Sequence, residues 1–126
     1  MKEIGERKKL RGYLKGYRMC LSQAKEIEIM IADGEVADCV RDELLRAKDE
    51  FILHCRTVQT IVNVYTEEGS LERSIFNSLY IAGKSMRQVA KATGYSYGHC
   101  ANTEANAINR LCGIKSVMEL IRKTGN

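Results

Sequence analysis

The first half of the chain carries apolar residues at alternating steps of three and four, a spacing that puts them on one face of a helix. The first such stripe predicts one long helix over about residues 4 to 32. Gly5, Gly12 and Gly16 weaken its start, because glycine costs about 1 kcal/mol relative to alanine inside a helix. Asp33-Gly34 is typical of a turn and ends the helix. The members of the stripe are Leu10, Tyr13, Tyr17, Cys20, Ala24, Ile27 and Ile31.

A second stripe with the same spacing follows at once and predicts a second long helix from residue 35 to about residue 66. Two long helices joined by so short a turn must run antiparallel, with their apolar stripes buried against each other. Because a hairpin of two helices has a thin core, we expect it to pack on the rest of the chain or to form a homodimer. The members of the second stripe are Val36, Val40, Leu44, Ala47, Phe51, Cys55, Val58, Val62 and Tyr65.

The last part of the chain, residues 70–122, predicts shorter helices that have their own capping signals. Ser70 is a favourable N-cap for an apolar helix that ends at Gly83. Ser116 with Glu119 forms a capping-box pattern and predicts a last short helix. The apolar residues of the first of these helices are Leu71, Ile75, Leu79 and Ala82, and those of the last are Val117, Leu120 and Ile121.

Between these two helices, the stretch from Ser85 to Leu111 predicts a helix, a tight turn and a second helix. Ser85 and Gln88 form a capping box, and Gly94 suits the left-handed position that ends the first helix. Ser96 can cap the second helix. The apolar face of the first helix is Val89, Ala90 and Thr93, and that of the second is Cys100, Thr103, Ala107 and Leu111.

This pattern of two capped helices joined by a glycine turn is typical of a DNA-binding helix-turn-helix, in which Tyr97 to Arg110 would be the recognition helix. The small Ala90 lets two steeply crossed helices approach each other closely. Two short helices around a glycine also occur in many all-α proteins without a DNA-binding role. We therefore predict an all-α fold, with a helical hairpin over residues 1–68 and a compact helix-turn-helix domain over residues 69–126.

Charge is distributed unevenly along the 126 residues, although the net charge is only +4. Residues 1–18 carry seven basic and two acidic side chains. Residues 19–69 carry five basic and eleven acidic side chains, and residues 70–126 carry eight basic and three acidic ones. Both ends therefore suit an anionic polymer, whereas the middle does not. The acidic face of the second helix is either a solvated surface or a docking face for a basic protein; it contains Glu35, Asp38, Asp42, Glu43, Asp49 and Glu50.

The residues that could carry chemistry are few and poorly spaced. The five cysteines form no C-x-x-C pair, and with two histidines they predict reduced thiols rather than a metal site. No phosphate-binding loop or paired-carboxylate motif is present, so we expect no enzyme, no catalytic residue and no cofactor. No apolar run reaches the roughly 20 residues of a membrane span, and the basic N-terminus lacks the apolar segment of a signal peptide. We expect a cytoplasmic protein with no membrane partner.

The segment from Glu104 to Leu111 resembles the end of the recognition helix in region 4 of bacterial sigma factors, where a Glu-Ala-x-Ala-Leu-x-x-Leu run is typical. Glu72-Arg73, Tyr80 to Gly83 and Val89-Ala90 are also similar to region 4, so the resemblance covers about residues 70 to 112. The preceding hairpin has no sigma counterpart. A long helical segment before such a module is similar to small phage and prophage transcription regulators of the ArpU and RinA type. This resemblance implies binding to double-stranded promoter or operator DNA, with RNA polymerase as a further partner.

The resemblance also implies a set of contacts on the DNA. Asn102 would be the best base reader, because its amide can make two hydrogen bonds to adenine. Gly98 departs from the family, which often has Glu there, and Tyr97 and Ala101 stand where it often has a basic residue. The alternative to DNA contact for Tyr97 is partial burial against the turn. The alternative for His99 is that it is an ordinary exposed residue. The implied groove contacts are Tyr97, Gly98, His99, Ala101, Asn102 and Asn106, and the implied phosphate contacts are Ser85, Arg87, Lys91 and Ser96.

Two other functions fit the same pattern. The small, DNA-recognising subunit of a phage packaging terminase can also join a helix-turn-helix to a helical oligomerisation element. A protein-interaction module without DNA binding fits the weakly charged recognition helix. Oligomeric state separates the packaging subunit from the transcription regulator. A ring of many subunits would favour packaging, whereas a monomer or dimer would favour regulation.

Overall fold

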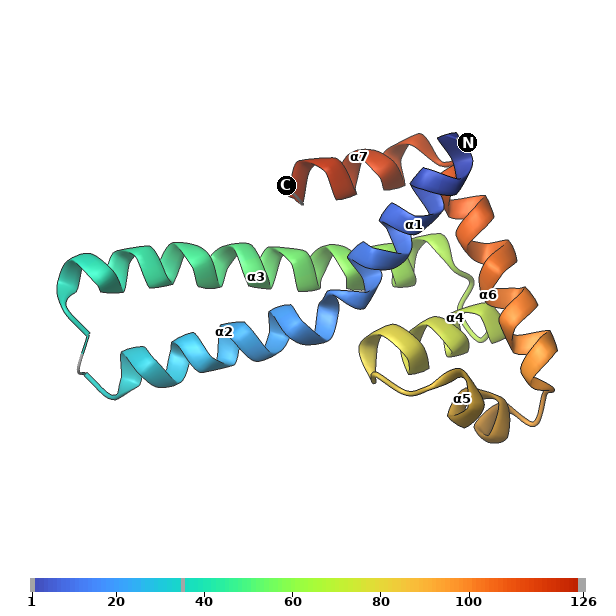
Figure 1. The fold of residues 1–126 in the computed structure, drawn as a ribbon, viewed down its shortest axis with the longest axis horizontal. Coiled ribbons are helices and arrows are strands. Elements are labelled where there is room, and N and C mark those ends of the chain that lie inside the picture. Colours follow the sequence, from blue (N-terminus) through green and yellow to red (C-terminus); the bar gives the residue numbers. More distant parts are fainter. Residues whose placement is uncertain (1, 35, 125–126) are drawn as a thin grey trace.

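The computed structural model describes residues 2–34 and 36–124, and this part of the chain is helical with no strand. The all-α prediction is therefore confirmed (Figure 1). The elements in order are α1 (Lys2–Lys15), α2 (Tyr17–Ala32), α3 (Asp38–Tyr65), α4 (Leu71–Phe76), the π-helical segment η1 (Asn77–Ile81), α5 (Met86–Thr93), α6 (Tyr97–Cys112) and α7 (Lys115–Thr124).

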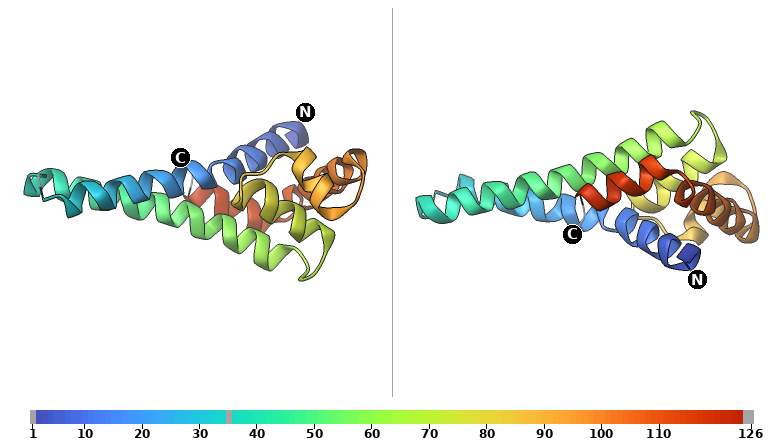
Figure 2. Two further views of the ribbon diagram at one scale, coloured as in Figure 1. Left: turned by 90° about the horizontal axis from the view of Figure 1, so that it is seen from below. Right: turned by 90° about the horizontal axis from the view of Figure 1, so that it is seen from above.

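Helices α2 and α3 form the predicted antiparallel hairpin, which projects away from the other elements as an arm (Figures 1 and 2). The predicted stripes are buried near the base of the arm, where Tyr17 and Cys20 of α2 and Cys55 and Val58 of α3 lie in the core and Cys55 Sγ donates to the carbonyl of Tyr17 at 3.5 Å. Toward the tip the burial declines, and Val40 is 45% exposed. The predicted acidic face is exposed from Asp38 to Glu50, whereas Glu35 lies outside the described residues; its members are Asp38, Asp42, Glu43, Asp49 and Glu50.

The first long helix differs from the prediction, because it is broken at Gly16 into α1 and α2. The ring of His54 occupies the space beside the break, where a Cβ on Gly16 would lie 3.0 Å from His54 Nε2. Nε2 donates a hydrogen bond of 2.7 Å to the carbonyl of Tyr13, and the two rings stack at 3.8 Å. Glycine is thus required by the close approach of α3, and α1 changes direction there.

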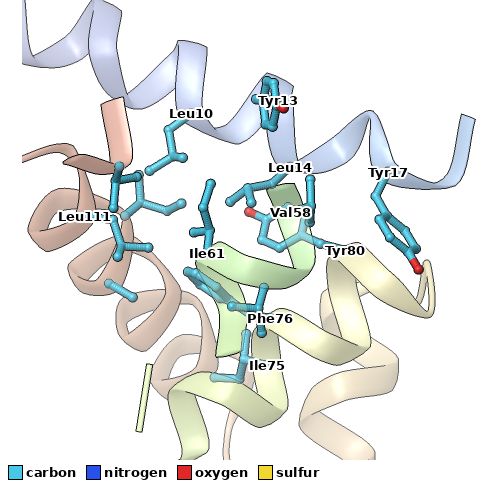
Figure 3. Packing of buried hydrophobic residues seen from close by; sticks show 14 of the residues in the cluster. Leu10, Tyr13, Leu14, Tyr17, Val58, Ile61, Ile75, Phe76, Tyr80 and Leu111 are labelled. Carbon is cyan, nitrogen blue, oxygen red and sulfur yellow. The ribbon is translucent and has the colours of Figure 1, made fainter. Parts of the chain in front are cut away.

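On the N-terminal side of this break, α1 leads away from the arm and packs against α6 and α7. Leu10 and Leu14 of α1 are fully buried, and Figure 3 shows them among side chains of α3, α4, η1 and α6. The same cluster includes Phe76, Ile108 and Val117. One hydrophobic core therefore joins the predicted hairpin segment to the predicted helix-turn-helix segment, and the boundary at residues 68 and 69 stays a prediction.

The helix-turn-helix of α5 and α6 forms with the predicted local contacts. Ser85 Oγ accepts from the N–H of Gln88 at 3.2 Å, and Gln88 Oε1 accepts from the N–H of Ser85 at 2.9 Å. Gly94 has a φ of +79°, so the turn uses the left-handed region that suits glycine. Ser96 Oγ accepts from the N–H of His99 at 3.1 Å and caps α6. Both caps and the turn are confirmed.

Two local predictions were incomplete or wrong. The helix that begins at Ser70 widens into a π segment, in which the N–H of Ala82 donates to the carbonyl of Asn77 at 2.8 Å. Ser116 does not cap the last helix, because α7 already begins at Lys115. Its hydroxyl instead forms a 2.8 Å hydrogen bond with the hydroxyl of Tyr65 at the end of α3.

Candidate nucleic-acid interface

Helix α6 has one buried and one exposed face. Cys100, Ala107 and Leu111 are buried in the core. On the opposite side runs a row of exposed residues spaced by three or four positions, which we call the polar stripe; it consists of Gly98, Asn102, Asn106 and Asn109. The three amides of this stripe carry donors and acceptors but no net charge, so they can form hydrogen bonds to base edges in a major groove.

The other predicted groove residues lie around this stripe in different positions. His99 is exposed and stacks on Tyr95, with ring centroids 4.8 Å apart and 27° between the planes. Tyr97 is 55% exposed, and it lies about 140° around the helix from Asn102. Ala101 is half-buried and about 100° from Asn102. Geometry therefore groups Gly98, Asn102 and Asn106, with His99 at their edge.

Of the predicted phosphate contacts, Ser85 and Arg87 lie at the N-terminal end of α5, Lys91 in its last turn, and Ser96 at the N-terminal end of α6. Arg87 and Lys91 are exposed on α5. Ser85 and Ser96 are exposed too, but their hydroxyls accept the capping hydrogen bonds described above. Each hydroxyl can still donate its proton to a phosphate oxygen. The free backbone N–H groups at the two helix N-termini can donate to a phosphate as well.

Three contacts of this region were missed by the sequence analysis. The first is the Tyr95–His99 stack, which places an exposed aromatic pair at the start of α6. The second joins α1 to the polar stripe, because Arg7 Nη1 donates to Asn109 Oδ1 at 2.7 Å. A separation of 102 positions between Arg7 and Asn109 leaves no local sequence signal for such a pair.

The third missed contact is a buried network beneath α6. Glu104 is only 6% exposed, and its carboxylate accepts from Arg11 Nε at 3.1 Å, Arg11 Nη2 at 2.7 Å and the Tyr80 hydroxyl at 2.6 Å. The hydrogen bond to Glu104 raises the pKa of Arg11, and burial followed by the hydrogen bond to Glu104 raises the pKa of Tyr80. The network fixes α1 and η1 against α6, with Arg11 charged and Tyr80 neutral.

The C-terminal end of α6 is held separately. Arg110 forms an ion pair with Glu72 of α4 and donates to the carbonyl of Tyr65 at 3.1 Å. Helix α6 is thus fixed to other elements at its middle, through Glu104, and at its C-terminal end, through Arg110, so its exposed face has a defined orientation.

Other kinds of chemistry find little support in the described part of the chain. Burial raises the pKa of the Cys20, Cys55 and Cys112 thiols, which reduces their reactivity at neutral pH. No three metal-ligating side chains come together between residues 2–34 and 36–124. Within the same ranges, no helix has the length and apolar character needed to cross a membrane.

Comparisons of the chain with known protein families, with curated proteins and with solved structures gave no match.

Proposed function

We propose that the protein is a sequence-specific DNA-binding transcription regulator. The observation that carries the proposal is the polar stripe of α6, which is presented by a capped helix-turn-helix on a helix fixed at its middle and at its C-terminal end. A helix with exposed Asn102 and Asn106 on one face can read base edges, and asparagine pairs best with adenine. The exposed Arg87 and Lys91 on α5 supply charges for the DNA backbone.

The place of action rests on the resemblance to sigma factor region 4. We infer promoter or operator DNA as the target and RNA polymerase as a further partner, in a phage or prophage setting and in the cytoplasm. A homodimer through the hairpin is the expected oligomer, because apolar side chains remain exposed along it: Ile29, Met30, Val40, Leu45 and Leu53. Sedimentation of the intact protein as a dimer would support this, while a ring of many subunits would favour the packaging terminase.

One observation favours a second function, that of a protein-interaction module. The exposed face of α6 carries no lysine or arginine among its central positions, and Tyr95 and Tyr97 expose aromatic surface beside it. Aromatic residues are enriched in protein interfaces. DNA binding by this helix would then be absent.

The deciding experiment is selection of bound duplexes from a random DNA pool, followed by titration of an enriched and a scrambled site. Enrichment of a defined sequence that the protein binds at least about tenfold more tightly than the scrambled site would support the regulator. Recovery of a pool without any enriched sequence, together with no measurable duplex binding, would exclude it and leave the interaction module.

A further inference from the structure

Helix α1 has a basic side that no predicted DNA contact includes. Arg7, Lys8, Arg11 and Lys15 together line one surface hollow on this helix. Leu10 and Leu14 point into the core from the adjoining face of the helix. The four charges are therefore collected on one side of an otherwise anchored helix, and they are not spread around it.

This basic side continues to the start of the helix-turn-helix. A second hollow is lined by Arg11 and Lys15 of α1 together with Lys84, the residue before the Ser85 cap of α5. We call the set of Arg7, Lys8, Arg11, Lys15 and Lys84 the basic row. It connects the phosphate-contacting end of α5 with the C-terminal half of α6, since Arg7 touches Asn109 of the polar stripe.

The arginines and lysines of the row have different surroundings. Arg11 is engaged by the buried Glu104, and Arg7 by Asn109, so these two position α1. Lys8, Lys15 and Lys84 are exposed, and the ion pairs found among residues 2–34 and 36–124 do not involve them. Glu6, the acidic neighbour on α1, lines other hollows, with Asn109 and with Lys9. The three ammonium groups are therefore available to an anion.

We propose that α1 is a second phosphate-binding element, which holds a DNA strand beside the helix-turn-helix through Lys8, Lys15 and Lys84. This inference rests on the proposed DNA-binding function. Lys8 and Lys15 are seven residues apart, about 10 Å along a helix. One DNA strand places about three phosphates over that distance along the duplex axis. A fixed row of that length beside the polar stripe matches a backbone better than a single compact anion.

The test compares two variants that lose the same charge. Lys8→Gln/Lys15→Gln removes two members of the basic row. Lys9→Gln/Lys25→Gln removes two exposed lysines elsewhere, one facing α7 and one on α2. Both are titrated on a labelled mixed-sequence duplex of about 30 base pairs, roughly three helical turns, across a salt series. Melting by circular dichroism checks that both remain folded.

We expect the row variant to bind about tenfold more weakly near 0.1 M salt and to lose roughly two units from the slope of log affinity against log salt. The matched variant should keep the slope of the unmodified protein. Equal slopes for all three proteins, with Arg87→Gln still weakening binding, would overturn the role of α1 and leave the proposed function standing. Equal losses in both double variants would overturn it as well, because only net charge would then matter. Absence of duplex binding by the unmodified protein would overturn both proposals.

Discussion

Arg11 of α1 and Glu104 of α6 form a bidentate ion pair across 93 positions of sequence. The Glu104 side chain is 8% exposed, whereas the Arg11 side chain is 37% exposed. A buried carboxylate that loses its cation is costly, and the partial exposure of Arg11 moderates the cost. The position of α1 beside α6 therefore depends in part on this pair, together with the buried Leu10 and Leu14 and the hydrogen bond from Arg7 to Asn109.

Replacing Arg11 tests that dependence. Arg11→Ala should lower the free energy of unfolding by about 2 kcal/mol, because Glu104 is left buried with Tyr80 as its remaining partner. Lys9→Ala on the same helix is the control and should change stability by less than about 0.5 kcal/mol. Urea denaturation measures both. The double variant Arg11→Ala/Glu104→Gln should recover part of the loss, and simple additivity in this cycle would contradict the coupling.

Tyr80 predicts a loss of stability at alkaline pH. Its pKa is raised in the folded protein, by burial and by the hydrogen bond to Glu104, above the ordinary value of 10.0. A group with a raised folded pKa contributes stability that is complete below its unfolded pKa and is lost as pH rises toward the folded one. The free energy of unfolding should therefore fall above pH 10 more steeply in the unmodified protein than in Tyr80→Phe. Parallel pH profiles for the two proteins would rule out this account.

The break between α1 and α2 predicts opposite effects at two glycines. Gly16→Ala should lower the free energy of unfolding by about 1 kcal/mol, because the new Cβ would lie 3.0 Å from the ring of His54. That ring cannot move away freely, since it stacks on Tyr13 and is hydrogen-bonded to its carbonyl. Gly12→Ala meets nothing within 4 Å and should stabilise the protein by about the same amount.

The background His54→Ala provides the decisive comparison for this break. With the ring removed, Gly16→Ala should become neutral or stabilising, because the backbone there is already in the right-handed helical region, with φ −71° and ψ −11°. Thermal melting of the single and double variants gives the answer. A penalty that persists without the ring would show that His54 is not its cause.

Asn102 and Arg87 should differ in what they contribute on DNA. Asn102→Ala should cost about 1–3 kcal/mol on a selected site and little on scrambled DNA, since it removes a base contact. Arg87→Ala should weaken both and shallow the salt dependence by roughly one unit of slope, since it removes a phosphate contact. Asn63→Ala, an exposed amide on α3, is the control. An equal loss on both duplexes for Asn102→Ala would show that the polar stripe is not the face that reads bases.

The sequence by itself determined the elements that depend on neighbouring residues. The capping box at Ser85, the left-handed Gly94 and the Ser96 cap involve only residues a few positions apart, so residue type predicts them. The apolar stripes of the hairpin follow from the periodicity of each helix. The exposed positions of Asn102 and Asn106 follow from the same periodicity, because they lie opposite the buried stripe of their own helix.

Only the tertiary structure decided where α1 lies and what it touches. Gly16 looked like a weak point inside one helix, and the ring of His54, brought by α3, made it a break. Ser116 looked like a cap, and the hydroxyl of Tyr65 gave it another partner. The pairing of Arg11 with Glu104 was likewise decided by the tertiary structure, because two residues so far apart in the chain share no periodic pattern that would predict their contact. The basic end of the chain was visible from its composition, but its alignment with the recognition helix depends on that long-range packing.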